Sequence, residues 1–372
     1  MNLCCSSSAG QVRRSEEWKA EASPLEQWFY DLPEATKQNI YDQQTKKSTS
    51  PTTGVRGTEE KVEEAAAEKA PNSGGDSLTP SQNGILPPVS DAGTVEAGST
   101  FPRNGEDEEH SWEPSPADMF RVRQPGYSST GQKAPSGPAF YETLRVDTFR
   151  TSERREGRLV PRTLRPCPHT VESGHPDVPS VFVVNCQIPN IDGAVVHSPF
   201  NKNPEYDGPC FQIVFHFGIT EQTRDWLRQL QEEGATAAVP PALRLWALWC
   251  REAPTSFERR AQFKAMAMVD NPEELNLPGL VLRYNGKPAL ITNSGTLSRG
   301  GPSLLQMDIN VHRFAYLARK GLDMVKEKLE QGRIRVGFTV ESREEEHLPE
   351  QMLGVCFFKK YKRNKAPLFH DL

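Results

Sequence analysis

The segment Phe211–Phe217 reads FQIVFHF and, together with Val181–Gln187 (VFVVNCQ), decides the fold class of this chain. Both segments are rich in β-branched and aromatic residues, which favour strands. In the first segment, Phe and Ile alternate with Gln, Val and His, so both faces of the strand carry bulky side chains. We therefore expect this strand to be central in its sheet and to end at Gly218.

Two helices are predicted after these strands. Glu221–Glu233 has an apolar stripe at helical spacing and ends before Gly234. Pro240–Cys250 has Pro in its opening turn and is apolar on nearly all sides. A helix of the second kind is typically buried on two sides or lies beside a cavity.

More strands and one long helix complete the pattern. Leu280–Tyr284 and Ala289–Thr292 flank Asn285-Gly286, which is the strongest short hairpin signal. His312–Gln331 carries an unbroken apolar stripe and predicts the longest helix. Further strands are predicted over Gln262–Asp270, Leu304–Ile309, Arg333–Glu341 and Leu353–Tyr361.

The order of these elements predicts an α+β domain. Several strands are joined by tight turns, which implies antiparallel pairing. We expect a curved antiparallel sheet packed on a long C-terminal helix and two shorter helices. The order lacks the strict strand–helix alternation of a parallel nucleotide-binding sheet.

The first third of the 372 residues has a different composition. Residues 46–116 hold 13 acidic and 6 basic side chains, with eight Pro, eight Gly and two aromatics. Such a segment cannot bury enough apolar surface to offset the entropy of ordering. We expect an N-terminal segment with a short helix at 1–45, a disordered acidic linker at 46–111, a folded domain at 112–366 and a tail at 367–372.

The N-terminal segment contains two candidate sites. Cys4 and Cys5 stand beside small polar residues, and adjacent thiols of this kind are candidates for S-acylation. Pro24–Asp42 predicts a short helix in which Trp28 and Phe29 are the candidate residues for docking a protein partner. The alternative is an isolated helix that is mostly unfolded in water.

A third candidate site is a run of cations near the C-terminus. Opposite charges attract it to an anionic membrane surface, at about 1 kcal/mol for each cation at close approach. The alternative is a charged edge strand that prevents aggregation between sheets. The run comprises Lys359, Lys360, Lys362, Arg363 and Lys365.

The sequence carries no catalytic signature. It has no Gly-rich phosphate loop, no Gly-x-Ser-x-Gly elbow and no His-Glu-x-x-His helix, so we expect neither an enzyme nor a bound cofactor. Cys167, His169 and His175 lack the paired spacing of a zinc site. The modest charge of the folded domain does not argue for nucleic acid.

Two titratable residues lie inside apolar strands. A functional interpretation makes Asp308 a ligand-orienting group, whereas we favour an ion pair or a cap for the helix that starts near His312. His216 lies between two Phe residues and is interpreted as a hydrogen-bonded core residue.

Cysteine usage and hydropathy indicate a compartment. Seven Cys without paired spacing predict free thiols and a reducing, cytoplasmic location. No apolar run approaches the length of about 18 residues that spans a bilayer, and no secretory signal is evident.

Several phrases, read in chain order, resemble the C-terminal domain of the plant ENHANCED DISEASE RESISTANCE 2 proteins. The resemblance covers residues 112–365, and it implies neither catalytic residues nor a cofactor. The pleckstrin-homology and START domains that precede this domain in plants have no counterpart in the polar segment 1–111. The phrases are Phe120-Arg121-Val122-Arg123 with Tyr127 and Lys133, Val184-Asn185-Cys186-Gln187-Ile188-Pro189, Phe263-Lys264, Gly286-Lys287-Pro288, Met307-Asp308-Ile309-Asn310, and Leu348-Pro349-Glu350 with Leu353-Gly354.

Two functions remain from the sequence. The first is a non-catalytic module that binds a lipid or another hydrophobic ligand and acts peripherally at membranes, because a curved sheet closed by a long amphipathic helix can enclose a cavity. The alternative is a regulatory protein-interaction scaffold with a solid core and a protein partner that the sequence does not identify.

Overall fold

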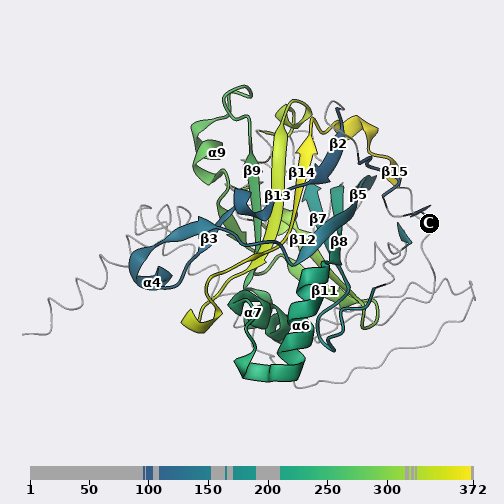
Figure 1. Cartoon of the computed structure of the whole chain (residues 1–372). Coiled ribbons are helices and arrows are strands. Elements are labelled where there is room, and N and C mark those ends of the chain that lie inside the picture. Colours follow the sequence, from purple (N-terminus) through teal and green to yellow (C-terminus); the bar gives the residue numbers. More distant parts are fainter. Residues whose placement is uncertain are drawn as a thin grey trace, which may run out of the picture. The chain divides into compact units, whose positions relative to one another are not determined.

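The computed structural model describes residues 95–96, 98–103, 109–151, 164–165, 171–189, 210–314, 318–319, 322 and 325–369, within one compact unit that spans Thr79–Leu372. These residues form a mixed α+β fold with two main sheets, as Figure 1 shows. The α+β class is confirmed, but the strands divide between two sheets instead of one curved sheet.

The first main sheet has six strands in the order β11-β12-β7-β8-β5-β15. β8 pairs antiparallel with both β7 and β5, so the FQIVFHF strand is central, as predicted. β7 pairs parallel with β12, and β5 pairs parallel with β15. The strands are β5 Tyr141–Thr151, β7 Val181–Pro189, β8 Cys210–Ile219, β11 Gly295–Arg299, β12 Leu304–Asn310 and β15 Leu368–Phe369.

The second main sheet has five strands in the order β10-β9-β13-β14-β2, and all its pairs are antiparallel. Two further pairs of strands lie outside the main sheets. The strands of the second sheet are β2 Ser111–Pro114, β9 Phe263–Val269, β10 Pro288–Leu290, β13 Arg333–Val340 and β14 Met352–Lys359. The smaller pairs are β3 Arg121–Arg123 with β4 Lys133–Pro135, and β1 Val95–Glu96 with β6 Leu164–Arg165.

The two longest described helices are α6 Glu221–Glu233 and α7 Pro241–Glu252, close to the predicted ranges. Figure 1 shows them together at one end of the strands. Thr220 caps α6 by accepting a hydrogen bond from the backbone of Thr223. The short helices are α4 Tyr127–Thr130, α8 Phe257–Arg260 and α9 Gly279–Tyr284. The 3-10 turns are η1 Ala117–Met119, η2 Gly234–Thr236, η3 Val311–Arg313, η4 Lys328–Glu330, η5 Glu345–His347 and η6 Arg363–Lys365.

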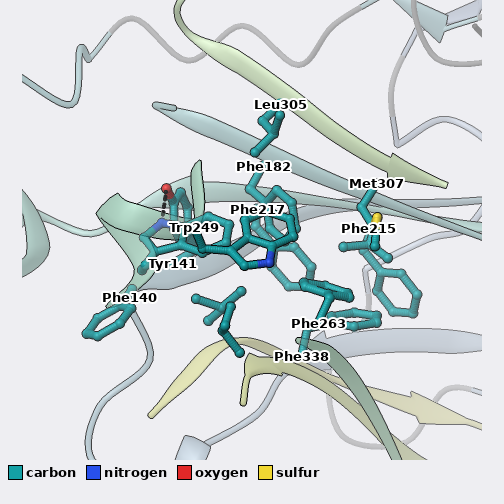
Figure 2. Close-up of a cluster of buried hydrophobic side chains, with 14 of the residues drawn as sticks. Phe140, Tyr141, Phe182, Phe215, Phe217, Trp249, Phe263, Leu305, Met307 and Phe338 are labelled. Atoms are coloured by element: carbon teal, nitrogen blue, oxygen red, sulfur yellow. Dashed lines mark hydrogen bonds between the residues drawn. The ribbon is translucent and has the colours of Figure 1, made fainter. Parts of the chain in front are cut away.

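The core lies between the two main sheets and α7. Aromatic rings of both sheets meet there, with centroids 5.3 Å apart for Phe215 and Phe338 and 5.9 Å apart for Phe182 and Phe263. Trp246 and Trp249 of α7 stack at 5.1 Å. Figure 2 shows the rings of Phe182, Phe215, Phe263, Phe338 and Trp249 gathered between the strands. Aromatic rings from the two sheets and α7 therefore pack directly against one another in the described part of the interior.

The hairpin predicted around Asn285-Gly286 is wrong. Residues before it form helix α9, and the strand after it, β10, pairs with β9. The side chain of Asn285 accepts a hydrogen bond from the Val269 N–H at 2.6 Å and donates one to the Val269 carbonyl at 3.0 Å. The side-chain amide of Asn285 therefore takes the place of a backbone partner for Val269 at the end of β9. A hairpin strand before Asn285 is not required.

The long helix predicted over His312–Gln331 is not shown. Its first residues form the 3-10 turn η3, and Phe314 has an extended backbone (φ −66°, ψ 155°), so a continuous helix does not begin at His312. Its last residues form η4. Much of the range between these turns lies outside the described residues.

Ordered stretches lie on both sides of the domain predicted at 112–366. Within the segment expected to be a disordered linker, Phe101 is fully buried and Ser111 begins β2. Within the expected tail, Leu368 pairs with Arg150 of β5. The folded unit therefore includes short stretches that precede and follow residues 112–366. Residues 1–94 lie outside the described residues.

Candidate functional site

Part of the predicted cation run pairs with carboxylates. The Nζ atom of Lys359 lies 2.7 Å from Glu113, and those of Lys360 and Lys362 lie 3.0 and 2.7 Å from Glu109. Hydrogen bonds from both lysines lower the pKa of Glu109 to about 2. Two carboxylates thus pair with three of the five cations.

The edge-strand alternative for this run is wrong. β14, which ends at Lys359, lies between β13 and β2, and Lys359 is opposite Ser111 in the register. β2 is the edge strand of this sheet. Arg363 and Lys365 belong to the turn η6. The other candidate residues, Cys4, Cys5, Trp28 and Phe29, lie outside the described residues.

Asp308 belongs to a buried polar network on one face of the six-stranded sheet. Its carboxylate accepts hydrogen bonds from the side-chain amides of Asn185 at 2.9 Å and Gln306 at 2.8 Å. The predicted capping role belongs to Asn310, whose side chain accepts from the His312 N–H at 3.0 Å. Parallel pairing of β12 with β7 places Asp308 opposite Asn185 and creates the network.

His216 is a hydrogen-bonded core residue, as predicted. Its Nε2 lies 3.1 Å from the carboxylate of Asp147, and both residues are fully buried. The same carboxylate accepts from the Gly98 N–H at 2.7 Å and from the Thr100 hydroxyl at 2.7 Å. Burial raises the pKa of Asp147, but the hydrogen bonds, that from His216 first, outweigh it and lower the pKa. Asp147 therefore anchors residues 98–100 to the sheet.

A second charged cluster lies where β9 meets the segment before β14. The Lys264 Nζ lies 2.7 Å from both carboxylate oxygens of Glu350, and this pair is buried. Glu350 also accepts from the Ser342 N–H at 2.9 Å. Arg123 adds a salt bridge of 2.8 Å to Glu341. This cluster joins three segments that are distant in the sequence.

Arg123 also belongs to the β3–β4 hairpin, where cations gather. Its guanidinium lies 4.7 Å from the centroid of the Tyr127 ring, and the Nζ of Lys133 lies 5.9 Å from the same centroid. Both are cation–π distances. Arg123, Tyr127 and Lys133, which belong to the sequence phrases that resemble the plant family, therefore lie together at one corner of the fold.

Three of the cysteines in the described part have thiols that are difficult to ionise. Cys186, Cys210, Cys250 and Cys356 form no disulfide. Burial raises the pKa of Cys186 to about 12 and also raises the pKa values of Cys250 and Cys356 well above the ordinary thiol value. Since the thiolate is the reactive form, these three thiols are not poised as nucleophiles.

The surface of the described part of the fold includes the following two pockets. One, of about 560 Å³, lies between α6, α7 and residues 175–177, and Leu230, Ala247 and Leu248 supply its apolar lining. Arg244 and Arg251 add positive charge to it. The other, of about 450 Å³, is lined by residues near β2 and the start of β5. The first pocket has the size and mixed lining of a small-ligand site.

The described residues contain no cluster of three or more His, Cys, Asp or Glu suited to a metal ion, and none of their helices is long and apolar enough to cross a membrane. The sequence analysis did not identify Asp147, Lys264 and Glu350 as the residues that hold the buried polar networks together. The available signal was a charged residue inside an otherwise apolar or alternating strand, as at Lys264 in FKAMAMV.

Comparison with known proteins gives one family. No curated protein and no solved structure matches the chain. The model of the C-terminal region of protein ENHANCED DISEASE RESISTANCE 2 matches residues 112–361, from the second residue of β2 to just beyond β14. This match spans more than half of the 372 residues, and the chain belongs to the ENHANCED DISEASE RESISTANCE 2 C-terminal domain family.

Proposed function

We propose that this chain is a non-catalytic binding module that acts through its surface, as a protein-interaction scaffold with a solid core. The observation that carries this proposal is the packed interior. Phe215 of one sheet lies 5.3 Å from Phe338 and 5.5 Å from Phe358 of the other, between ring centroids. An interior filled in this way supports a structural core and weighs against cargo held between the sheets.

The buried titratable groups also favour a non-catalytic module. The carboxylates of Asp147 and Glu350 are each fixed by several donors, and Lys264 is held by Glu350. A general acid or base needs access to a substrate atom. Asp147, Glu350 and Lys264 are buried and hold segments of the chain together, so their role is structural.

The first test is native mass spectrometry of the purified full chain. The scaffold proposal expects the mass of the polypeptide alone, 41.6 kDa. A co-purifying lipid that survives delipidation and exchange would contradict it and favour the cargo alternative.

The second test is affinity capture from a lysate with quantification of co-captured proteins. We expect Trp28→Ala/Phe29→Ala to lose a partner that the wild type retains. Phe257→Ala is the matched control, because this aromatic side chain is 51% exposed on the folded domain. Equal capture by all three proteins would remove the role proposed for Trp28 and Phe29.

A second candidate function is binding of a lipid or another hydrophobic ligand at a membrane surface in the cytoplasm. The specific observation in its favour is the pocket of about 560 Å³ beside α7, whose apolar lining and two arginines suit an acyl chain with an anionic head. Leu248→Glu places a charge in this lining. If this candidate is correct, we expect the wild type to bind a fluorescent fatty acid and Leu248→Glu not to bind it. The scaffold proposal expects neither protein to bind it.

A further inference from the structure

Two cations face each other across the β3–β4 hairpin. In its antiparallel register Arg123 is directly opposite Lys133. Cross-strand partners lie on the same face of a sheet, and like charges in these positions repel. The hairpin therefore carries an unfavourable interaction that other groups must offset.

Arg123 has such groups, whereas the described residues supply none to Lys133. The guanidinium of Arg123 pairs with Glu341 at 2.8 Å and donates to the Ser342 carbonyl at 3.4 Å. Among the described residues, no carboxylate lies within salt-bridge distance of the Lys133 ammonium, whose nearest aromatic contact is the Tyr127 ring at 5.9 Å. Lys133 is half-buried, so water does not fully compensate its charge.

The electrostatic surroundings of Lys133 are positive on balance. Burial, followed by the charge of Arg123, lowers the pKa of Lys133, and Lys287 adds to this effect while Glu350 opposes it. Lys287 is exposed and has no salt bridge within the described part of the chain. It immediately precedes Pro288 of β10, which is opposite Met266 of β9, and Met266 packs in the same apolar cluster as Val122 of β3. Arg121 lies on the same face of β3 and donates a hydrogen bond to the Lys133 carbonyl.

The carboxylates of this corner are already engaged. Glu350 is bound by Lys264, and Glu341 is shared between Arg123 and Arg343. Glu345 accepts a hydrogen bond from the backbone of Gly126. Glu344 and Glu346 lie 3.1 and 3.9 Å from ring nitrogens of His347. The salt bridges of this corner therefore leave Lys133 and Lys287 without a carboxylate partner among the described residues.

We propose that Lys133 and Lys287, with Arg121 and Arg123 beside them, form a binding site for a phosphate group. A phosphate monoester carries a charge of about −1.5 to −2 at neutral pH and several strong acceptor oxygens, which suit a cluster with excess positive charge. The phosphate belongs either to a free small molecule or to a lipid headgroup, and both present the same oxyanion to these side chains. This site is independent of the scaffold function proposed above.

The test measures binding of two probes to the full chain. Inositol trisphosphate, followed by isothermal titration calorimetry, represents the free source. Phosphatidylcholine vesicles with and without a phosphatidylinositol phosphate, followed by sedimentation, represent the headgroup. For Lys133→Gln/Lys287→Gln we expect binding about tenfold weaker or more, because two charge-assisted contacts are lost. Binding to vesicles alone assigns the headgroup, and binding to the soluble probe alone assigns the free molecule.

The matched control is Lys360→Gln/Lys362→Gln, which removes two lysines that both pair with Glu109 and lie in another part of the sequence. We expect this control to bind both probes like the wild type. Loss of binding in the control equal to that in Lys133→Gln/Lys287→Gln, binding to neither probe by the wild type, or binding only to a phosphorylated peptide would overturn the proposal.

Protein stability provides a second readout that separates binding from folding. Without phosphate, Lys133→Gln should melt at the same temperature as the wild type or higher, since it removes the repulsion with Arg123. Inositol trisphosphate should raise the melting temperature of the wild type and not that of Lys133→Gln. A variant that melts lower without the probe shows that Lys133 has a structural role and contradicts the proposal.

Discussion

Lys264 and Glu350 are 86 positions apart in the sequence, yet the Lys264 Nζ lies 2.7 Å from both carboxylate oxygens of Glu350. Both side chains are almost completely buried. Glu350 also accepts a backbone hydrogen bond from Ser342, so this pair ties β9 to the segment between β13 and β14. Removing one partner leaves an uncompensated charge in a medium of low polarity.

We therefore predict that Lys264→Met lowers the free energy of unfolding by about 3–5 kcal/mol. The double variant Lys264→Met/Glu350→Met should be less destabilised than the sum of the two single variants, because neither charge remains without its partner. Urea denaturation of the full chain measures both quantities. Arg333→Ala is the control, since its salt bridge to Glu274 is exposed and is worth less than about 1 kcal/mol. Additive single effects would contradict the coupling.

Local sequence patterns predicted some elements well and missed others for physical reasons. The α6 boundaries follow from Thr220 and Gly234, which are local capping signals. β5, the strand Tyr141–Thr151, was missed because Arg145 and Asp147 interrupt its apolar pattern. The charge of Asp147 is tolerated there only because His216 and residues 98–100 supply donors, and these contacts are not local.

The candidate sites also differ in whether local sequence or non-local contacts determine them. The cation run ending at Lys365 is visible in the sequence, but its salt bridges to Glu109 and Glu113 depend on pairing between β2 and β14. Conversely, Lys133 is unremarkable in the sequence and becomes electrostatically exceptional only when the hairpin register places it opposite Arg123. Charge pairing over long distances in the chain therefore set the limit of the prediction.

Gly354 allows the close approach of the two sheets. A Cβ atom at this position would lie 2.5 Å from the Phe217 ring, and the neighbouring rings leave little room for that ring to move. We predict that Gly354→Ala lowers the free energy of unfolding by about 1–3 kcal/mol through overpacking. Gly279→Ala, where a Cβ atom meets no other atom within 4 Å, should leave stability unchanged or slightly higher. Equal melting temperatures for the two variants would contradict this account.

His110 makes the stability of the domain dependent on pH. Its Nδ1 accepts a hydrogen bond from the Lys362 N–H at 3.0 Å, which requires this nitrogen to be unprotonated. Burial, together with the charges of Lys365 and Lys362, lowers the pKa of His110 to about 4. The unfolded chain, with an ordinary His pKa of about 6.5, binds the proton more readily. Stability is therefore fully present above about pH 6.5 and is lost as the pH falls toward about 4.

We predict that this loss amounts to at most about 3 kcal/mol. The measurement is the difference in the free energy of unfolding between about pH 7 and about pH 4.5. His110→Asn is the informative variant, because Asn does not titrate and tolerates the positive φ of 61° at this position. This variant should show a smaller difference than the wild type. His175, whose pKa is also lowered, contributes equally to both proteins. An unchanged pH dependence in His110→Asn would assign the effect to other groups.

Asp147 joins the stretch before Phe101 to the six-stranded sheet. Its two carboxylate oxygens accept from the backbone N–H groups of Gly98 and Thr100, and also from the Thr100 hydroxyl. An amide nitrogen cannot accept these hydrogen bonds, so Asp147→Asn should leave donors unpaired at a cost of about 1–3 kcal/mol. We predict faster hydrogen exchange at Gly98 and Thr100 in Asp147→Asn, measured by mass spectrometry of the full chain. Asp118→Asn, a change at an exposed carboxylate, should exchange like the wild type there. The same exchange at these two amides in all three proteins would show that Asp147 does not hold the segment.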